Sequence, residues 1–248
     1  MRIKRIQRLF EDGSVNVCGK RGSGKDMLTS NVVVRRKLPY VSTVPYDNNL
    51  YRPFDYSKID LNGATYKDLI NGRCSGYVYP YPDKTDIYLS DCGVFFPSQY
   101  CGELNRDYPE LSTFVALSRQ LGDCSVHFNS QAPQRPWDKL REQAETYIRC
   151  RWCKVLTIGK LKLVFQKITI YDKFQSCVDK VEPCRITVPL LGSKEVKLNA
   201  KMHIDKFTNT YGKITSHLLI YRHISDYDTR YFKTLLKGDT PENEKENT

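Results

Sequence analysis

The sequence of 248 residues contains no run of about 18 apolar residues, so no membrane-spanning helix is expected. Its opening, MRIKRIQRLF, is basic but has no continuous apolar core, which excludes a secretory signal. This opening is expected to form a short amphipathic helix on the domain surface. No internal repeat is evident. These absences predict a cytoplasmic protein, or one held peripherally at a membrane through a partner.

An even cysteine count is also missing: there are nine, which favours reduced thiols over a disulfide framework. Cys150 and Cys153 form a C-x-x-C pair, and Cys177 and Cys184 lie downstream. Four thiolates would suit zinc, but residues 147–156 are expected to form a strand, where positions three apart face opposite sides. The second pair also has loose spacing for zinc. We therefore expect half-buried thiols at these positions.

Acidic residues are outnumbered. The chain has 39 Lys and Arg against 28 Asp and Glu, a formal net charge of +11. A balance this basic predicts a polyanionic partner, either nucleic acid or an acidic membrane surface. We favour DNA slightly, given the phosphate-binding motif below. The alternative is a basic surface that serves only solubility.

The most informative stretch is SVNVC followed by GKRGSGKD. A short apolar run, a glycine-rich loop ending in Gly-Lys and a helix-compatible segment over residues 27–37 form the strand–loop–helix context of a phosphate-binding P-loop. Glycines let loop N–H groups approach phosphate oxygens, and the helix points its positive dipole end at the same anion. The predicted ATP-binding residues are Gly19, Lys20, Arg21, Gly22, Ser23, Gly24, Lys25 and Asp26.

One position departs from the G-x-x-x-x-G-K-[ST] pattern. Asp26 stands where a Ser or Thr hydroxyl normally ligates Mg²⁺. A carboxylate is also a hard oxygen ligand, so Asp26 is a candidate metal ligand. Its negative charge lies close to the phosphates, which affects the expected rate of catalysis more than nucleotide binding.

A second acidic position follows an apolar strand. Residues 86–91, DIYLSD, are expected to form a strand that ends at Asp91, where P-loop enzymes place the aspartate that holds Mg²⁺ or its water. The next residue is Cys92, and a thiol is a poor replacement for a carboxylate base. Glu103 or Glu110 are alternative bases.

Alternating strands and helices up to about residue 150 predict an α/β fold, with a mostly parallel sheet and helices on both faces. Residues 46–64 are expected to form an irregular loop, and residues 109–121 a helix. The strand over residues 124–130 ends at Gln131, at the sheet edge where α/β proteins bind ligands. Gln131 is thus a candidate γ-phosphate or water contact, or a loop glutamine bonded to backbone.

The residue pattern changes from residue 147 onward, where Lys and Arg are interspersed in short β-prone runs. These runs predict a β-rich extension, with strands added to the core sheet. The expected organisation is a P-loop ATPase core over residues 1–150, the β-rich extension over 151–236 and a disordered tail over 237–248.

Three stretches in this order resemble the N-terminal ATPase domain of the zonula occludens toxin (Zot) family. They are the loop over residues 19–26, the strand ending at Asp91 with Phe96-Pro97 beyond it, and a segment over residues 117–131. That segment carries the pattern of an Arg and a Gly-Asp before a strand ending in Gln. The family includes filamentous-phage assembly ATPases and belongs to the FtsK–HerA group of DNA-pumping ATPases.

The resemblance implies an ATP-hydrolysing motor of a phage or mobile element, for virion assembly, DNA packaging or export. It implies phosphate contacts from Lys25, Mg²⁺ at Asp91, γ-phosphate sensing by Gln131 and a trans-acting role for Arg119 in a homo-oligomer. DNA and a virion or membrane assembly partner follow as expectations. Cys92 replaces the family's glutamate, and the family's transmembrane segment is not visible. The alternatives are a nucleotide or small-metabolite kinase and a non-hydrolysing, nucleotide-gated assembly protein.

Overall fold

The structure is a computed structural model that describes residues 3–46, 50–54, 81, 85–100, 102–103, 106, 124–182 and 211–225. The helix expected over residues 109–121, the tail from residue 237 and part of the β-rich extension lie outside these residues. Among the described helices, none is long and apolar enough to cross a membrane.

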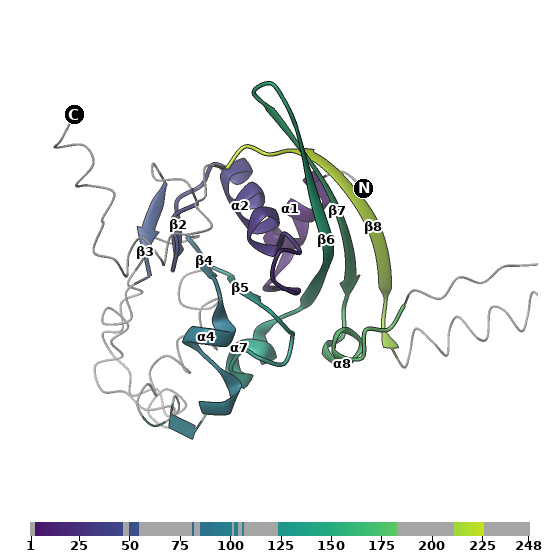
Figure 1. The fold of residues 1–248 in the computed structure, drawn as a ribbon. Coiled ribbons are helices and arrows are strands. Elements are labelled where there is room, and N and C mark those ends of the chain that lie inside the picture. Colours follow the sequence, from purple (N-terminus) through teal and green to yellow (C-terminus); the bar gives the residue numbers. More distant parts are fainter. Residues whose placement is uncertain are drawn as a thin grey trace, which may run out of the picture.

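A single eight-stranded sheet runs through the described part of the molecule (Figure 1). From β3 to β6, neighbouring strands pair in parallel, while β6–β7 and β7–β8 are antiparallel. This confirms the predicted α/β fold with a mostly parallel sheet. The order across the sheet is β3 (Tyr51–Pro53), β2 (Tyr40–Ser42), β4 (Asp86–Leu89), β5 (Val126–Ser130), β1 (Val15–Cys18), β6 (Thr146–Ile158), β7 (Leu161–Tyr171) and β8 (Ile214–Arg222).

Short helices cover the sheet. The helix after the glycine-rich loop, α2, spans Lys25–Arg36, because left-handed Gly24 and Lys37 bound it on the two sides. The other described helices are α1 (Ile3–Asp12), α4 (Cys92–Phe95), the 3₁₀ helix η2 (Ser98–Tyr100), α7 (Asp138–Gln143) and α8 (Phe174–Val178).

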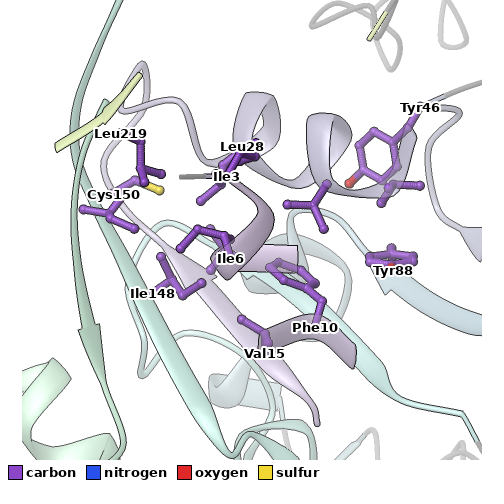
Figure 2. Close-up of a cluster of buried hydrophobic side chains, with 14 of the residues drawn as sticks. Ile3, Ile6, Phe10, Val15, Leu28, Tyr46, Tyr88, Ile148, Cys150 and Leu219 are labelled. Carbon is purple, nitrogen blue, oxygen red and sulfur yellow. The ribbon is translucent and has the colours of Figure 1, made fainter. Parts of the chain in front are cut away.

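Helix α1 is the expected amphipathic surface helix: its charged side is exposed, and its apolar side belongs to the main core. Its sequence is amphipathic, and Ile3, Ile6 and Phe10 recur at helical spacing on one side. All three are buried against the sheet and α2, where Figure 2 shows them beside Val15 and Ile148. Through these three buried side chains, α1 packs against β1 and α2 and stabilises their positions.

A second core lies on the opposite face of the sheet. Trp137 and Leu140, from the start of α7, pack with Cys92 of α4 against strand residues Val126 and Phe128. The two cores confirm the predicted helices on both faces. They also position the sheet's carboxyl edge, because β1, β4 and β5 are adjacent and parallel and therefore end side by side.

The stretch over residues 46–64 was expected to be irregular throughout, and this is wrong for part of it. Tyr51–Pro53 forms β3, which pairs in parallel with β2 at the edge of the sheet. The strand is only three residues long and ends in proline, so it has no periodic pattern that a sequence reading detects. An edge position tolerates that proline because one side of the strand has no partner strand.

Strand β6 runs without interruption through residues 150 and 151, where the core was expected to give way to the extension. It pairs with β1 on one side and with β7 on the other. Strands β7 and β8 are thus added to the core sheet, as the β-prone runs predicted. The division into functional domains stays a prediction.

Candidate nucleotide-binding site

The glycine-rich loop leaves β1 and turns directly into α2. Gly24 has φ 82°, a left-handed conformation that favours glycine, and an added Cβ there would lie 2.6 Å from the Cβ of Cys153. At Gly19, an added Cβ would lie 2.6 Å from the carbonyl oxygen of Cys150. The loop therefore packs tightly on β6, and only glycine fits at these two points.

Helix α2 presents unused N–H groups to this loop. Its hydrogen-bond ladder begins with the N–H of Leu28 bonded to the carbonyl of Gly24, 2.9 Å away, so the first-turn amides at Lys25 and Asp26 have no helical partner. The hydroxyl of Ser23 is buried and makes no hydrogen bond within the described part of the chain. These donors form an arrangement that suits a phosphate oxygen.

Two carboxylates converge on Lys25. Its buried ammonium Nζ lies 3.2 Å from Asp26 Oδ2 and 3.7 Å from Asp91 Oδ1. Asp91 follows the end of β4 in a left-handed conformation, φ 50°, which brings the strand's carboxyl end to the loop. The sequence placed these three residues at one site, and the structure brings them together at the carboxyl edge of the sheet.

Opposing effects act on the pKa of Asp91 in this group of Lys25, Asp26 and Asp91. Burial raises the pKa of Asp91, the Lys25 ammonium lowers it, and the nearby Asp26 charge raises it again, so that the pKa stays above its ordinary value. Two carboxylates around one ammonium leave one net negative charge when all three are ionised. That charge, together with hard oxygen donors, suits a Mg²⁺ ion that also takes phosphate oxygens and waters as ligands.

Asn129 holds Asp26, and the sequence reading missed it. The Asn129 amide Nδ2 donates to Asp26 Oδ1 at 3.0 Å, and the hydroxyl of Thr29 donates to Asn129 Oδ1 at 3.0 Å. Asn129 lies on β5 and is buried. One carboxylate oxygen is thereby fixed on β5, while the other faces Lys25. The available signal was an amide side chain close to the carboxyl end of the predicted strand.

Cys92 points away from the site. It is fully buried in the core against α7, its thiol donates to the carbonyl of Leu89 at 3.3 Å, and burial raises its pKa well above the ordinary value. A neutral buried thiol has neither the charge nor the position of a general base. Of the alternative bases, Glu103 is exposed and Glu110 lies outside the described residues.

Gln131 directly follows β5 at the same sheet edge and is exposed. Its side-chain oxygen accepts a hydrogen bond from Arg135 Nη1 at 3.2 Å, which ties the two side chains into one surface pair. Arg119, the candidate trans-acting arginine, lies outside the described residues. Lys20 and Arg21 are exposed on the outer side of the loop.

A buried glutamine of β7 contacts the glycine-rich loop from the side of the sheet. Gln166 Nε2 donates to the carbonyl oxygens of Ser23, at 3.2 Å, and Gly24, at 2.9 Å. Its own oxygen accepts from the hydroxyl of Tyr221 on β8, at 2.8 Å. Two loop carbonyls are thus held toward the sheet, and β7 and β8 become supports of the phosphate loop. The sequence signal was a single glutamine at a core-facing position of a strand.

The expectation that Cys150 and Cys153 face opposite sides is wrong. The pairing of β6 with β7 shifts register between Cys150 and Trp152, which inserts one residue into β6. Both cysteines consequently lie under the phosphate loop, and burial raises the pKa of each thiol. Within the described residues, no three Cys, His, Asp or Glu side chains form a metal-binding group. Cys184 lies outside them.

No protein-family model matches the sequence, and no curated protein matches it. Among solved structures, the N-terminal domain of zonular occludens toxin from Neisseria meningitidis aligns over 89% of this chain and 97% of that chain, with a TM-score of 0.39 and 9% identity. The genome packaging NTPase of Sulfolobus turreted icosahedral virus 2, in complex with AMPPCP, covers 55% and 73%, with a TM-score of 0.37 and 13% identity.

ATPases 2 and 3 of EssC from Geobacillus thermodenitrificans align over 82% of this chain and 45% of that chain, with a TM-score of 0.39 and 12% identity. These likenesses are distant. The function proposed below therefore rests on the geometry of the site.

Proposed function

We propose that this protein binds ATP at the glycine-rich loop. The observation that carries this proposal is the convergence of Lys25, Asp26 and Asp91 at the start of α2. Lys25 would leave its carboxylate partners for the β- and γ-phosphates, while the loop and first-turn amides bind phosphate oxygens. The buried, unpartnered hydroxyl of Ser23 is a further donor for the same anion.

Mg²⁺ fits the two carboxylates of this site. Asp91, with Asp26 beside it, would hold the ion or its waters, and the ion would neutralise charge on the phosphates. The amide of Asn129 keeps Asp26 turned to this position. The carboxylates of Asp26 and Asp91 would then bind the metal as well as Lys25. The ammonium of Lys25 would thereby be free to contact the nucleotide.

We further propose that ATP hydrolysis drives a motor of a phage or mobile element, acting in the host cytoplasm in virion assembly, DNA packaging or export. The sequence motifs shared with the Zot family and the net charge of +11 support DNA as a partner. Assembly would occur as a homo-oligomer in which Arg119 completes a neighbouring site, together with a virion or membrane partner.

The test is ATP binding and turnover by the purified chain with Mg²⁺, with and without single- and double-stranded DNA. Lys25→Ala removes the buried ammonium, and Lys4→Ala on the exposed side of α1 is the matched control. Binding that is lost in Lys25→Ala and kept in Lys4→Ala supports the nucleotide site. Turnover that rises with DNA supports the motor. Equal ATP binding by both variants contradicts the whole proposal.

The burial of Cys92 favours a second candidate, a non-hydrolysing protein in which bound ATP controls assembly. This candidate predicts tight ATP binding that needs Lys25, with no turnover under any DNA condition. A third reading is a kinase, which would need a lid whose arginines grip the donor phosphates. Arg135, Arg141 and Arg149 lie where the sequence could supply such a lid, but the contacts of two of them favour this reading less. Arg149 donates to the carbonyl of Cys177 at 2.8 Å, and Arg141 stacks over Phe174 at 5.2 Å, so both serve the fold.

A further inference from the structure

The β6–β7 hairpin extends beyond the helices that cover the rest of the sheet (Figure 1). Its inner face packs on α1 and α2 through Val164 and Ile168, which are fully buried. The outer face near Tyr147 and Tyr171 packs with α8. Beyond Arg151, toward the turn of the hairpin, no other described element covers the outer face of the sheet, which is therefore exposed.

Apolar side chains gather on this outer face. Residues that pair directly across strands place their side chains on the same face. Ile158 pairs with Leu161 at the turn, Leu156 with Leu163 one step further, and Phe165 with Ile220 of β8. Their exposure is high for aliphatic residues: 57% for Ile158, 49% for Leu156 and 54% for Ile220. Trp152 and Leu218 extend the same surface, at 43% and 45%.

Cations interleave with these apolar side chains. Lys154 pairs opposite Phe165, and Lys167 lies between Trp152 and Leu218. Arg222 stands beside Leu163 on β8. Residues 146–167 contain no Asp or Glu, and neither does β8. The surface is therefore apolar and positively charged at once, with no acidic residue in the strands that carry it.

We propose that this outer face of the β6–β7 hairpin and β8 binds the surface of an anionic lipid bilayer. Exposed aliphatic side chains gain free energy by entering the acyl boundary, and Lys side chains extend to reach anionic headgroups. Trp152 has the amphipathic ring that settles at a membrane interface. This proposal concerns a different surface from the nucleotide site and does not depend on ATP binding.

Other occupants fit the surface less well. DNA would meet the cations but would leave Leu156, Ile158 and Ile220 against a phosphate backbone, where apolar side chains gain little. A second copy packed by the same face would place Lys154 and Lys167 against like charges. A bilayer with anionic lipids provides headgroups that pair with the cations and an acyl region that takes up the apolar side chains.

The test is vesicle flotation of the purified full chain. Vesicles of phosphatidylcholine alone are compared with vesicles that also contain phosphatidylglycerol, at low and high salt. We expect co-flotation with the anionic vesicles, weakened by salt, because charge and apolar burial act together. Ile158→Asp should lower the partition coefficient about tenfold or more, since it removes an inserted side chain and adds a repelled charge.

Leu38→Asp is the matched control. Leu38 is 49% exposed at the end of α2, so this variant makes a comparable loss of exposed apolar area and the same change of charge away from the hairpin. It should float as the unmodified chain does. Equal loss of flotation in the two variants, or flotation unchanged in both, overturns the proposal. Absence of flotation of the unmodified chain with any vesicle overturns it as well.

Tryptophan emission gives an independent reading. The chain has two tryptophans, of which Trp137 is fully buried in the core and Trp152 is exposed on the proposed surface. Anionic vesicles should shift the emission to shorter wavelength, and Trp152→Phe should abolish the shift. DNA that shifts this emission when vesicles do not would assign the surface to nucleic acid and contradict the proposal.

Discussion

The side-chain amide of Gln166 donates to the carbonyl oxygen of Gly24 at 2.9 Å, although the two residues are 142 positions apart in the sequence. Gln166 belongs to an antiparallel strand added to the sheet, and Gly24 closes the phosphate loop. Carbonyls that face the sheet leave the loop's N–H groups on the other side, where an anion is expected. The added strands thus support the candidate site.

Gln166→Leu tests this support. The variant leaves the carbonyl of Ser23 and the hydroxyl of Tyr221 buried without a partner, and it leaves the carbonyl of Gly24 with the N–H of Leu28 alone. The free energy of unfolding should therefore fall by about 2 kcal/mol. ATP affinity, measured by calorimetry on the folded variant, should fall several-fold. Tyr221→Phe removes one hydrogen bond only and should cost about 1 kcal/mol. Unchanged ATP affinity in Gln166→Leu would reduce the contact to a stabilising role.

Opposite effects of pH are expected at the two ends of β4. At Asp91, just past the strand, the pKa is raised in the folded protein, so the folded state binds the proton more tightly. Stability therefore falls as pH rises from the unfolded pKa through the folded one. Asp91→Asn removes this cost and should raise the melting temperature at neutral pH. The gain should vanish at a pH below the unfolded pKa.

Asp86, at the start of β4, behaves in the reverse way. Burial raises its pKa, but His127, Arg36 and the N–H of Ser125 together lower it below the ordinary value. Its contribution to stability is full above the unfolded pKa and is lost as pH falls through the folded pKa. Asp86→Asn should lower the melting temperature at neutral pH, with a smaller effect in acid. Thermal melts of both Asn variants across pH would show whether their signs differ, and equal signs would contradict this account.

Cys92 should be dispensable for chemistry. Cys92→Ala removes a buried thiol and should cost about 1 kcal/mol of stability while leaving any ATP turnover per folded molecule unchanged. Cys92→Glu puts a carboxylate into the core against Trp137 and Leu140. The free energy of unfolding should therefore fall by several kcal/mol, and ATP turnover should not rise. Loss of turnover in folded Cys92→Ala would show that the thiol takes part.

The charge of Asp26 should make nucleotide binding depend on metal. Asp26→Ser restores the residue type usual at this position and removes a negative charge beside the phosphates. ATP affinity without Mg²⁺ should rise about tenfold, and the further gain from Mg²⁺ should shrink. Asn129→Ala, which frees Asp26 without changing charge, is the control for mere repositioning. A metal dependence equal to that of the unmodified chain would exclude Asp26 from the ion's surroundings.

The elements that the sequence predicted well are those set by neighbouring residues. The apolar run, the glycine spacing and the following helix were visible together, and so was the strand before Asp91, although it ends at Leu89 and not at Asp91 as predicted. These patterns act within about a dozen residues, and the structure follows them from β1 through α2 and in β4. The carboxyl edge of the sheet could be predicted because parallel strands end together.

What the sequence could not show depends on distant contacts. Asn129 and Gln166 reach the phosphate loop from strands more than 100 residues further along, and nothing local marks them as its partners. The extra residue in β6 turns Cys150 and Cys153 to the same side, and period-two reasoning fails across such an insertion. The amphipathic pattern of α1 was visible, but its partner surface was not.

The position of β1 in the sheet has a consequence for synthesis of the chain. Both neighbours of β1 come late: β5 begins at Val126 and β6 at Thr146, whereas β1 ends at Cys18. During synthesis the glycine-rich loop therefore leaves the ribosome well before both neighbouring strands, and until they follow only α1 and α2 pack against β1. If ATP binds as proposed, chains cut before β7 should be retained less on an ATP resin than chains that include Gln166.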